Sequence, residues 1–385
     1  MKINTLLKKI CTCFDRLSTN GKSPRFSTSD PIALSLSKGE HEGFHFQYPT
    51  RAIIPGLAIL ALPFFFGACG RQEEKQAAKA EKKLNVVTTV APITSIVENI
   101  GGDKIQLTGI IPEGINSHTF EPIPSDSKLL SGADLIIING LDLETPTVNL
   151  AQANLKPRAF IYSLGDKTIK ETDYIYDFSF PKEQGHPNPH LWLNPEYAMR
   201  YAMLVRDELV RLDPANKSAY EQNAAQFLKK LEALDQAIKE GIQTIPQNNR
   251  RLLTYHDSWP YFARRYGFQV IGAVQPSDFA DPSPREVVRL IEQIKKEKVP
   301  AVFGSEVFPS PVLEQIAREA KSRYIDKLRD DELPGKPGDA RHSYVGMMVE
   351  NMTIMFEALR GSAEALKKVD PAPVAGTHAD YRRKD

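Results

Sequence analysis

Short apolar, β-branched runs alternate with helical segments along most of the chain from residue 84 onward. The runs LNVVTTV, IQLTGII and ADLIIING each lead into a turn or loop, SIVENIGG and SDSKLLSG lie between them, and AFIYSL supplies a fourth strand. Strands that alternate with helices in this way are typical of parallel βαβ units. The pattern therefore predicts an α/β lobe over residues 84–213.

A long amphipathic helix is predicted over residues 214–242. Its apolar positions follow a helical period, at Tyr220, Ala224, Phe227, Leu231, Leu234 and Ile238. Alternation then resumes with RRLLTYH, FQVIGAV and AVFGSEV, each followed by a helical segment. We therefore predict an α/β fold of two α/β lobes with parallel sheets joined by one long α-helix, the second lobe covering 243–361 and a flexible tail covering 362–385.

The segment before the first lobe has the pattern of an export signal. An apolar run from Ile53 to Phe66 follows Arg51, and small residues stand directly before Cys69. The run is shorter than the roughly 20 residues of a spanning helix, which favours a signal sequence over an anchor. Because the small residues before Cys69 resemble a bacterial lipobox, we predict a lipoprotein signal peptide over 51–69 and lipidation of Cys69. A plain cleavable signal is the alternative.

Two further segments flank this signal. Residues 70–83 are charged and alanine-rich, without an apolar face, so we predict a flexible tether. Residues 1–50 precede a signal that would normally begin at the initiator methionine, and we interpret them as a non-native or mis-annotated extension. Cys11 and Cys13 would be lost with the signal, which leaves nitrogen and oxygen as the metal ligands of the mature chain. The protein is expected to be extracytoplasmic, in the periplasm or at the cell surface.

Charge and composition exclude one class of partner. The formal net charge is +1, and no basic stripe is interleaved with aromatic residues. The chain therefore lacks the electrostatic pattern of a nucleic-acid-binding protein. We expect a monomer.

Four histidines stand in predicted loops far apart in the chain: His118 in GINSHTFEP, His190 in HPNPHLWLNP, His256 in LLTYHDSWPYF and His342 in DARHSYVGMM. Neutral imidazole is a common ligand of divalent transition metals. His118 and His256 follow strands, and the carboxyl ends of parallel strands are where open α/β sheets bind ligands. A single loop histidine is more often solvent-exposed or hydrogen-bonded, but the four together predict a metal site in the cleft between the lobes.

The local sequences around these residues resemble a known family, the periplasmic or lipoprotein solute-binding components of zinc and manganese ABC importers. The resemblance covers about Leu84 to Gly361, and its motifs are VVTTVAPI, SHTFEP, NPHLWLNP, YHDSWPYFARRYG, VFGSEVFPSP and HSYVGMMVEN. It implies two α/β lobes joined by one long helix and a metal ion bound by one residue from each of four loops. It also implies an ABC importer permease in the membrane as partner.

The resemblance also implies which residues bind the metal. His118, His190 and His256 match three ligand positions, and a histidine at the third is typical of zinc-type members, where manganese-type members have glutamate. At the fourth position many members have an aspartate before Ser/Thr-Tyr, whereas this chain has His342. Four nitrogen ligands suit Zn²⁺ better than Mn²⁺, so we expect zinc as the cargo and manganese or another divalent metal as the less favoured one.

Several other residues are candidates for the surroundings of the site. If His342 points away, water, Asp326 or Glu306 could complete the ligand shell. Asp257 or Asp281 could orient a ring nitrogen. His186 is the nearest competitor of His190. Three aromatic residues are expected to pack around the site or within the core: Phe120, Trp192 and Trp259.

The predicted function is capture of extracytoplasmic zinc and its delivery to a membrane permease, without enzymatic activity. A manganese- or iron-binding relative or an adhesin of the same family is the alternative. A zinc hydrolase would need an open coordination position and a general base, and no HExxH motif occurs. Because imidazoles bind metal only when neutral, weaker metal binding is expected as the pH falls through roughly 6.5.

Overall fold

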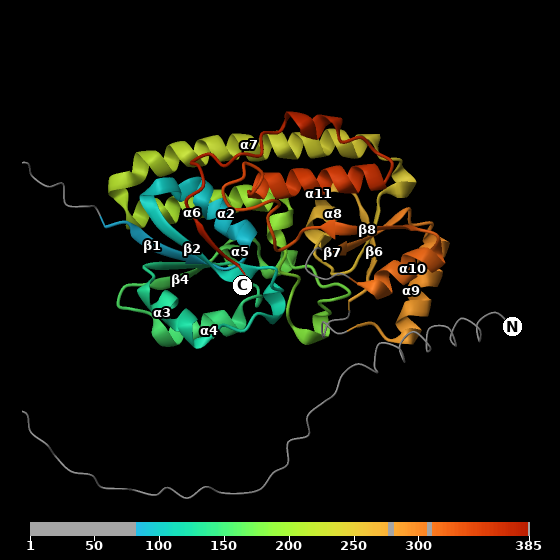
Figure 1. Cartoon of the computed structure of the whole chain (residues 1–385), viewed down its shortest axis with the longest axis horizontal. Coiled ribbons are helices and arrows are strands. Elements are labelled where there is room, and N and C mark those ends of the chain that lie inside the picture. The colour runs from blue at the N-terminus through green and yellow to red at the C-terminus, as the bar shows by residue number, and fades with distance from the viewer. Residues whose placement is uncertain (1–81, 276–280, 306–309, 384–385) are drawn as a thin grey trace, which may run out of the picture. The chain divides into compact units, whose positions relative to one another are not determined.

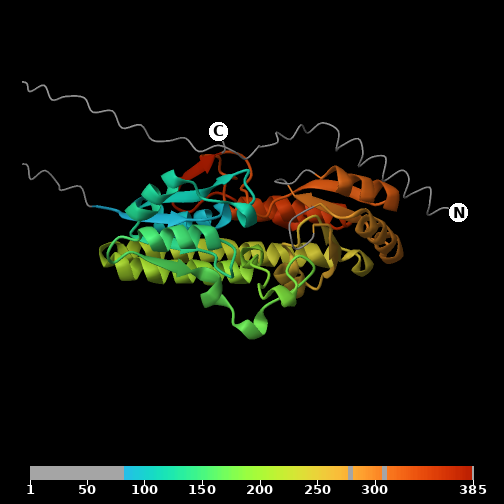
Figure 2. The same ribbon diagram turned by 90° about the horizontal axis from the view of Figure 1, so that it is seen from below.

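The computed structural model describes residues 82–275, 281–305 and 310–383, and these residues form two parallel β-sheets (Figures 1 and 2). The first sheet has the strand order β4-β3-β1-β2-β9, and the second has the order β6-β5-β7-β8. The strands of the first sheet are β1 (Leu84–Thr88), β2 (Ile105–Glu113), β3 (Leu135–Ile138), β4 (Phe160–Ser163) and β9 (Asp380–Arg383). Those of the second are β5 (Arg251–Thr254), β6 (Gln269–Ala273), β7 (Ala301–Ser305) and β8 (Arg323–Leu328). The predicted α/β class with parallel sheets is confirmed.

The central strands of the first sheet form where the sequence is apolar on both faces. All four residues of β3 are buried, and Val86 and Val87 of the neighbouring β1 are fully inaccessible to solvent. A strand of a parallel sheet with helices on both faces needs such a continuous apolar run, because side chains on both faces of the sheet are shielded from water.

Helices connect the strands and cover the sheets. Those of the first lobe are α2 (Ala91–Gly101), α3 (Pro124–Gly132), α4 (Thr145–Asn154), α5 (Leu164–Thr168) and α6 (Pro195–Leu212). Those of the second lobe are α8 (Pro260–Tyr266), α9 (Pro284–Glu297), α10 (Pro311–Ala320) and α11 (Tyr344–Ala358). Among the described residues, no helix has the length and apolar content needed to cross a membrane.

The long helix predicted over 214–242 is α7 (Lys217–Thr244), which follows a single 3₁₀ turn at Pro214–Asn216. Its predicted apolar positions are all completely buried, namely Tyr220, Ala224, Phe227, Leu231, Leu234 and Ile238. The helix packs on α2 and α6 of the first lobe and on α11, and Figure 1 shows it running past both sheets. The predicted connection of two lobes by one long helix is therefore confirmed.

The end of the chain differs from the predicted flexible tail over 362–385. Residues Glu364–Lys368 form a 3₁₀ turn, and β9 then pairs in parallel with β2 at the edge of the first sheet. The buried carboxylate of Glu98 accepts hydrogen bonds from the backbone N–H groups of His378 and Ala379 (2.6 and 2.7 Å) and from the Tyr381 hydroxyl (2.9 Å). The prediction failed because the partners of this polar segment lie about 280 residues earlier in the chain, beyond the reach of any local pattern.

Deletion of residues 378–385 is expected to destabilise the fold. The deletion would leave Glu98 buried without three hydrogen-bond donors and Asp126 without Arg382, which contacts it at 2.6 Å. Leaving such groups unpaired should lower the free energy of unfolding by about 3 kcal/mol. Urea unfolding measures the difference, and deletion of residues 384–385 alone is the control. Equal stability of both truncated proteins would mean that the tail contributes nothing.

The remaining predictions for the N-terminal region, the extension over 1–50, the signal over 51–69 with Cys69, and nearly all of the tether over 70–83, lie outside the described residues.

Candidate metal centre

Three of the four predicted histidines meet at one point. The Nε2 atoms of His118, His190 and His256 form a triangle in which each pair is 3.1 Å apart. His190 and His256 are buried, and His118 is partly exposed. This is the one cluster of histidine, cysteine or carboxylate ligands found among the described residues with the spacing of a metal site.

Two of these histidines stand in loops that follow the carboxyl ends of strands, one in each sheet. His118 lies in a 3₁₀ turn (Ser117–Thr119) after β2. The backbone N–H of His118 donates a hydrogen bond of 2.9 Å to the side-chain oxygen of Asn116. His256 follows β5, and the preceding residue is tied to β7 by a hydrogen bond from Tyr255 N to Phe303 O of 2.7 Å. A metal ion at this point therefore joins the first lobe to the second.

His190 comes from the long loop between α5 and α6, immediately before the 3₁₀ turn at Leu191–Leu193. Asn188 fixes this residue twice, because its Oδ1 accepts from the His190 backbone N–H at 3.0 Å and lies 2.8 Å from Nδ1. The Asn188 amide in turn donates to the carboxylate of Asp177 at 2.8 Å. The loop thus holds the imidazole in one orientation, as metal-binding histidines require.

Amide oxygens set the tautomer of two of the rings. His256 Nδ1 lies 3.0 Å from Gln275 Oε1, just as His190 Nδ1 faces Asn188 Oδ1. An amide oxygen only accepts, so each Nδ1 carries the proton and each Nε2 presents a lone pair to the centre of the triangle. Orientation by Asp257 or Asp281 was predicted, but for these two rings neutral amides do this instead.

The triangle has the size of a metal site. Three atoms 3.1 Å apart lie about 1.8 Å from their common centre, slightly less than the 2.0–2.1 Å of a bond between zinc and a histidine nitrogen. A metal ion displaced slightly from the plane can therefore contact all three atoms at once. The opposite side of the ion is left for a fourth ligand.

Burial keeps the three rings neutral. It lowers the pKa of His256 to about 4 and lowers the pKa values of His118 and His190 well below the ordinary imidazole range. The proximity of the other rings adds to this effect at His118 and His190, because a second positive charge so close would be repelled. Neutral rings are the form that binds a metal cation.

An aromatic side chain that sequence analysis did not identify covers the cluster. The Phe180 ring lies 5.5 to 5.9 Å from all three imidazoles, measured between ring centres. Of the three aromatic residues that were predicted, Trp192 packs on His190 at 5.1 Å, whereas Trp259 packs against Phe262 in the core and Phe120 is partly buried. Phe180 stands in a segment without regular secondary structure, so no periodic pattern indicated its position.

The structure does not place His342 with the other three histidines. His342 is fully buried just before α11, with Nε2 3.5 Å from Glu113 Oε1 and its ring packed edge-on against Tyr381 at 4.7 Å. These neighbours are the end of β2 and the C-terminal strand β9. The prediction of His342 as a fourth ligand therefore differs from the observed arrangement, in which this residue contacts the C-terminal segment.

A different carboxylate contacts the residue before His118, although it is not one of the three clustered side chains. Asp331 follows β8, and its Oδ2 accepts a hydrogen bond of 3.1 Å from the backbone N–H of Ser117, the residue before His118. Its Oδ1 is buried without a hydrogen-bond partner among the described residues. Burial raises the pKa of Asp331 to about 6. Of the carboxylates that were predicted instead, Asp326 is exposed within β8 and Glu306 lies outside the described residues.

A cavity of about 190 Å³ leads to the exposed side of His118. It is lined by His118, Phe180 and an exposed pair in which His186 Nδ1 lies 2.9 Å from Asp142 Oδ2. His186, the competitor of His190 in the same sequence motif, is therefore at the edge of this cavity and not in the cluster.

Comparisons with known proteins agree with this arrangement of two lobes around a metal-ligand cluster. The model of the periplasmic zinc-uptake complex component A family matches residues 86–358. The metal ABC transporter substrate-binding lipoprotein FimA of Streptococcus parasanguinis is 32% identical over 306 residues, covering 78% of this chain and 96% of that protein. The manganese ABC transporter substrate-binding lipoprotein PsaA of Streptococcus pneumoniae is 30% identical over 311 residues, covering 80% and 98%.

Solved structures give the same result. The periplasmic zinc-binding protein TroA of Treponema pallidum superimposes with a TM-score of 0.65 at 27% identity, covering 72% of this chain and 99% of that one. The manganese-bound periplasmic metal-binding protein of Candidatus Liberibacter asiaticus has a TM-score of 0.64 at 26% identity, covering 72% and 100%.

Fold and cluster together define a periplasmic-type metal-binding protein with two lobes. The chain belongs to the zinc-uptake complex component A family, the substrate-binding components of metal ABC transporters. The predicted family resemblance is confirmed. Proteins of this family bind and hand over a metal ion to a transporter permease and are not enzymes.

Proposed function

We propose that this protein captures zinc outside the cytoplasm and delivers it to the permease of an ABC importer. The observation that carries the proposal is the triangle of three Nε2 atoms 3.1 Å apart. In this buried site the lone pairs of His190 and His256 face each other with His118 Nε2 equally close to both, and a cation between the three atoms removes the repulsion. The fold therefore maintains an arrangement that a bound metal stabilises.

Ligand chemistry favours zinc over manganese. Neutral imidazole nitrogens suit zinc, whereas manganese prefers carboxylate, carbonyl and water oxygens. Several of the relatives are named for manganese. Zinc is favoured here by the three imidazole nitrogens of this chain and by the histidine at position 256 in particular.

Asp331 is our candidate for the fourth ligand. Its position after β8 corresponds to that of His256 after β5, at the same edge of the second sheet. The hydrogen bond from Ser117 holds one carboxylate oxygen near His118, and the second oxygen is available to a metal. Three imidazoles and one carboxylate make a four-coordinate shell that excludes water, which suits transport of the ion and not activation of a hydroxide.

We also propose that a lipid on Cys69 anchors the protein to the membrane and that the protein acts as a monomer. The small residues before Cys69 support the anchor, and several relatives are named lipoproteins. Mass spectrometry of the N-terminal peptide tests the anchor, because a diacylated cysteine as the first residue is the expected result. An unmodified N-terminus would favour the plain signal peptide.

Competition between metals tests the cargo. The purified protein is dialysed against equal concentrations of Zn²⁺ and Mn²⁺, and the bound metals are counted by elemental analysis. We expect one zinc ion per chain and an excess of zinc over manganese of more than about 100-fold, as a nitrogen-rich site requires. Equal occupancy, or preference for manganese, would reject zinc as the cargo.

The pH dependence of zinc binding follows from the pKa shifts. The imidazole pKa values are lowered, so these rings stay neutral and compete little for protons between pH 7 and 5. The pKa of Asp331 is raised to about 6, so this carboxylate takes up a proton first. We expect zinc affinity to be constant above pH 6.5, to fall about tenfold per pH unit below 6, and to fall more steeply near pH 4, where His256 is protonated.

Equilibrium dialysis against zinc at constant ionic strength measures this profile. In Asp331→Asn the decrease in zinc affinity between pH 6 and pH 5 should disappear. A steep loss already between pH 7 and 6.5 in the wild-type protein would mean that the imidazoles titrate in their ordinary range.

A further inference from the structure

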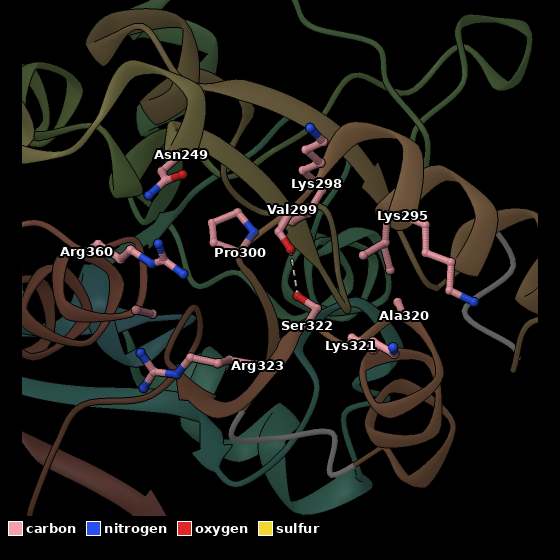
Figure 3. Close-up of a pocket in the computed structure, with 12 residues that line it drawn as sticks. Asn249, Lys295, Lys298, Val299, Pro300, Ala320, Lys321, Ser322, Arg323 and Arg360 are labelled. Atoms are coloured by element: carbon pink, nitrogen blue, oxygen red, sulfur yellow. Dashed lines mark hydrogen bonds between the residues drawn. The ribbon is translucent and has the colours of Figure 1, made fainter.

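A large basic pocket lies at the end of the second sheet that is opposite the histidine cluster. Its volume is about 630 Å³, and it lies where β7 and β8 begin (Figure 3). Five of the residues that line it are cationic, namely Lys295, Lys298, Lys321, Arg323 and Arg360. No carboxylate is among the described residues that line it.

Within the described residues these five cations have no ionic partner. None of them forms an ion pair with a carboxylate in the described part of the chain, although seventeen such contacts occur elsewhere in it, from Lys104 with Asp103 to Arg382 with Asp126. Arg323 makes one long contact of 3.5 Å with the backbone oxygen of Glu357. In a chain with a formal net charge of +1, five unpaired positive charges around one pocket are a marked local excess.

Helix ends explain only part of this excess. The helices α9, α10 and α11 end at Glu297, Ala320 and Ala358, next to the pocket, and cations at helix C-termini offset the negative end of the helix dipole. Each helix end is equivalent to about half a negative charge, so the three together offset roughly 1.5 of five positive charges. A net positive charge of about 3.5 therefore remains for a ligand.

The shape and polar groups of the pocket suit an anion. In Figure 3 the guanidinium groups of Arg323 and Arg360 lie on one side, and the ammonium groups of Lys295 and Lys321 lie on the other. The floor between them is fixed, because Ser322 Oγ donates to Val299 O at 2.9 Å. Planar guanidinium groups bind phosphate oxygens in pairs, and lysines add point charges.

We propose that this pocket binds a phosphate-bearing anion. The ligand can be soluble, such as an inorganic polyphosphate, or it can be the headgroup of an anionic phospholipid. Both present the same charged oxygens. The proposal does not depend on the cargo of the histidine cluster, which lies beyond the opposite ends of strands that are about 13 to 20 Å long.

Two probes separate the two sources of phosphate. The full-length chain carrying Cys69→Ala, which cannot be acylated at that position, is titrated with pyrophosphate by calorimetry. The same protein is sedimented with vesicles of phosphatidylglycerol and phosphatidylcholine in equal parts, with vesicles of phosphatidylcholine alone as background. The test variant is Arg323→Gln with Arg360→Gln, and the control is Lys296→Gln with Lys327→Gln, which removes two exposed charges from α9 and β8 outside the pocket.

We expect at least tenfold weaker binding of one or both probes in the pocket variant and less than twofold change in the control. Pyrophosphate binding without vesicle binding assigns a soluble ligand, and vesicle binding alone assigns a lipid headgroup. Zinc binding should be the same in all proteins. The proposal is overturned if the protein with the unsubstituted pocket binds neither probe. It is also overturned if the pocket variant and the control variant lose the same amount of affinity for the probes, because the cations would then serve only the helix ends.

Discussion

Replacement of His190 by alanine is expected to lower zinc affinity by more than about 100-fold. Loss of a residue that only supports a ligand costs 10- to 100-fold, and loss of a ligand itself should cost at least the upper value. His190 has no exposed surface, and its Nε2 is 3.1 Å from the Nε2 atoms of both other rings. Calorimetric titration with zinc in competition with a chelator measures the change.

The matched control for this prediction is His186→Ala. His186 lies four residues earlier in the same loop, is exposed, and pairs with Asp142 instead of the cluster. Its replacement should change zinc affinity less than threefold. Thermal unfolding of the metal-free proteins checks that both variants fold. Equal loss of affinity in the two variants would show that the loop, and not the ligand at position 190, determines binding.

The second prediction contrasts Asp331→Asn with His342→Asn. Asp331→Asn removes the charge of the proposed fourth ligand and should weaken zinc binding about 10- to 100-fold. His342→Asn should leave zinc affinity within about threefold of wild type, because its ring contacts Glu113 and Tyr381. It should instead lower the free energy of unfolding by about 1 to 2 kcal/mol through lost packing on Tyr381.

The same zinc titration, combined with urea unfolding of the metal-free proteins, separates these effects. Weaker zinc binding in His342→Asn with unchanged binding in Asp331→Asn would restore His342 as the fourth ligand. Unchanged binding in both variants would leave water as the fourth ligand.

The convergence of three candidate ligands could be predicted largely from sequence because local rules determine two of their positions. His118 and His256 follow apolar strands, and the carboxyl ends of parallel strands in two neighbouring sheets face the same region. The apolar positions of α7 were predicted for a similar reason, because a helical period determines which side chains face the core. His190 was identified from its motif, since the direction of its long loop depends on contacts such as that of Asn188 with Asp177.

The proposed fourth ligand could not be predicted in the same way. His342 stands next to a polar loop as the other histidines do, and only the return of the chain end as β9 places Tyr381 against it. One feature of the sequence could have indicated Asp331. It belongs to the pair Asp330 and Asp331, which stands shortly after the strand RYIDKL. The carboxylates predicted as alternatives were Asp326 and Glu306, and no local pattern distinguished Asp331 from them.

Residues from distant parts of the sequence make up the rest of the site. Phe180, Asn188 and Gln275 contact the imidazoles, yet each lies in a segment whose sequence has neither the period of a helix nor that of a strand. Their role depends on the approach of two lobes, which long-range packing determines. The basic pocket is a similar case, because its cations come from the ends of three helices and the start of one strand.

The most direct test of the account is a crystal structure of the zinc-loaded protein with anomalous diffraction data above and below the zinc absorption edge. We predict a single zinc peak bound by Nε2 of His118, His190 and His256 and by a carboxylate oxygen of Asp331, with His342 outside the shell. A metal ion bound through His342, or a zinc peak away from the three histidines, would contradict it.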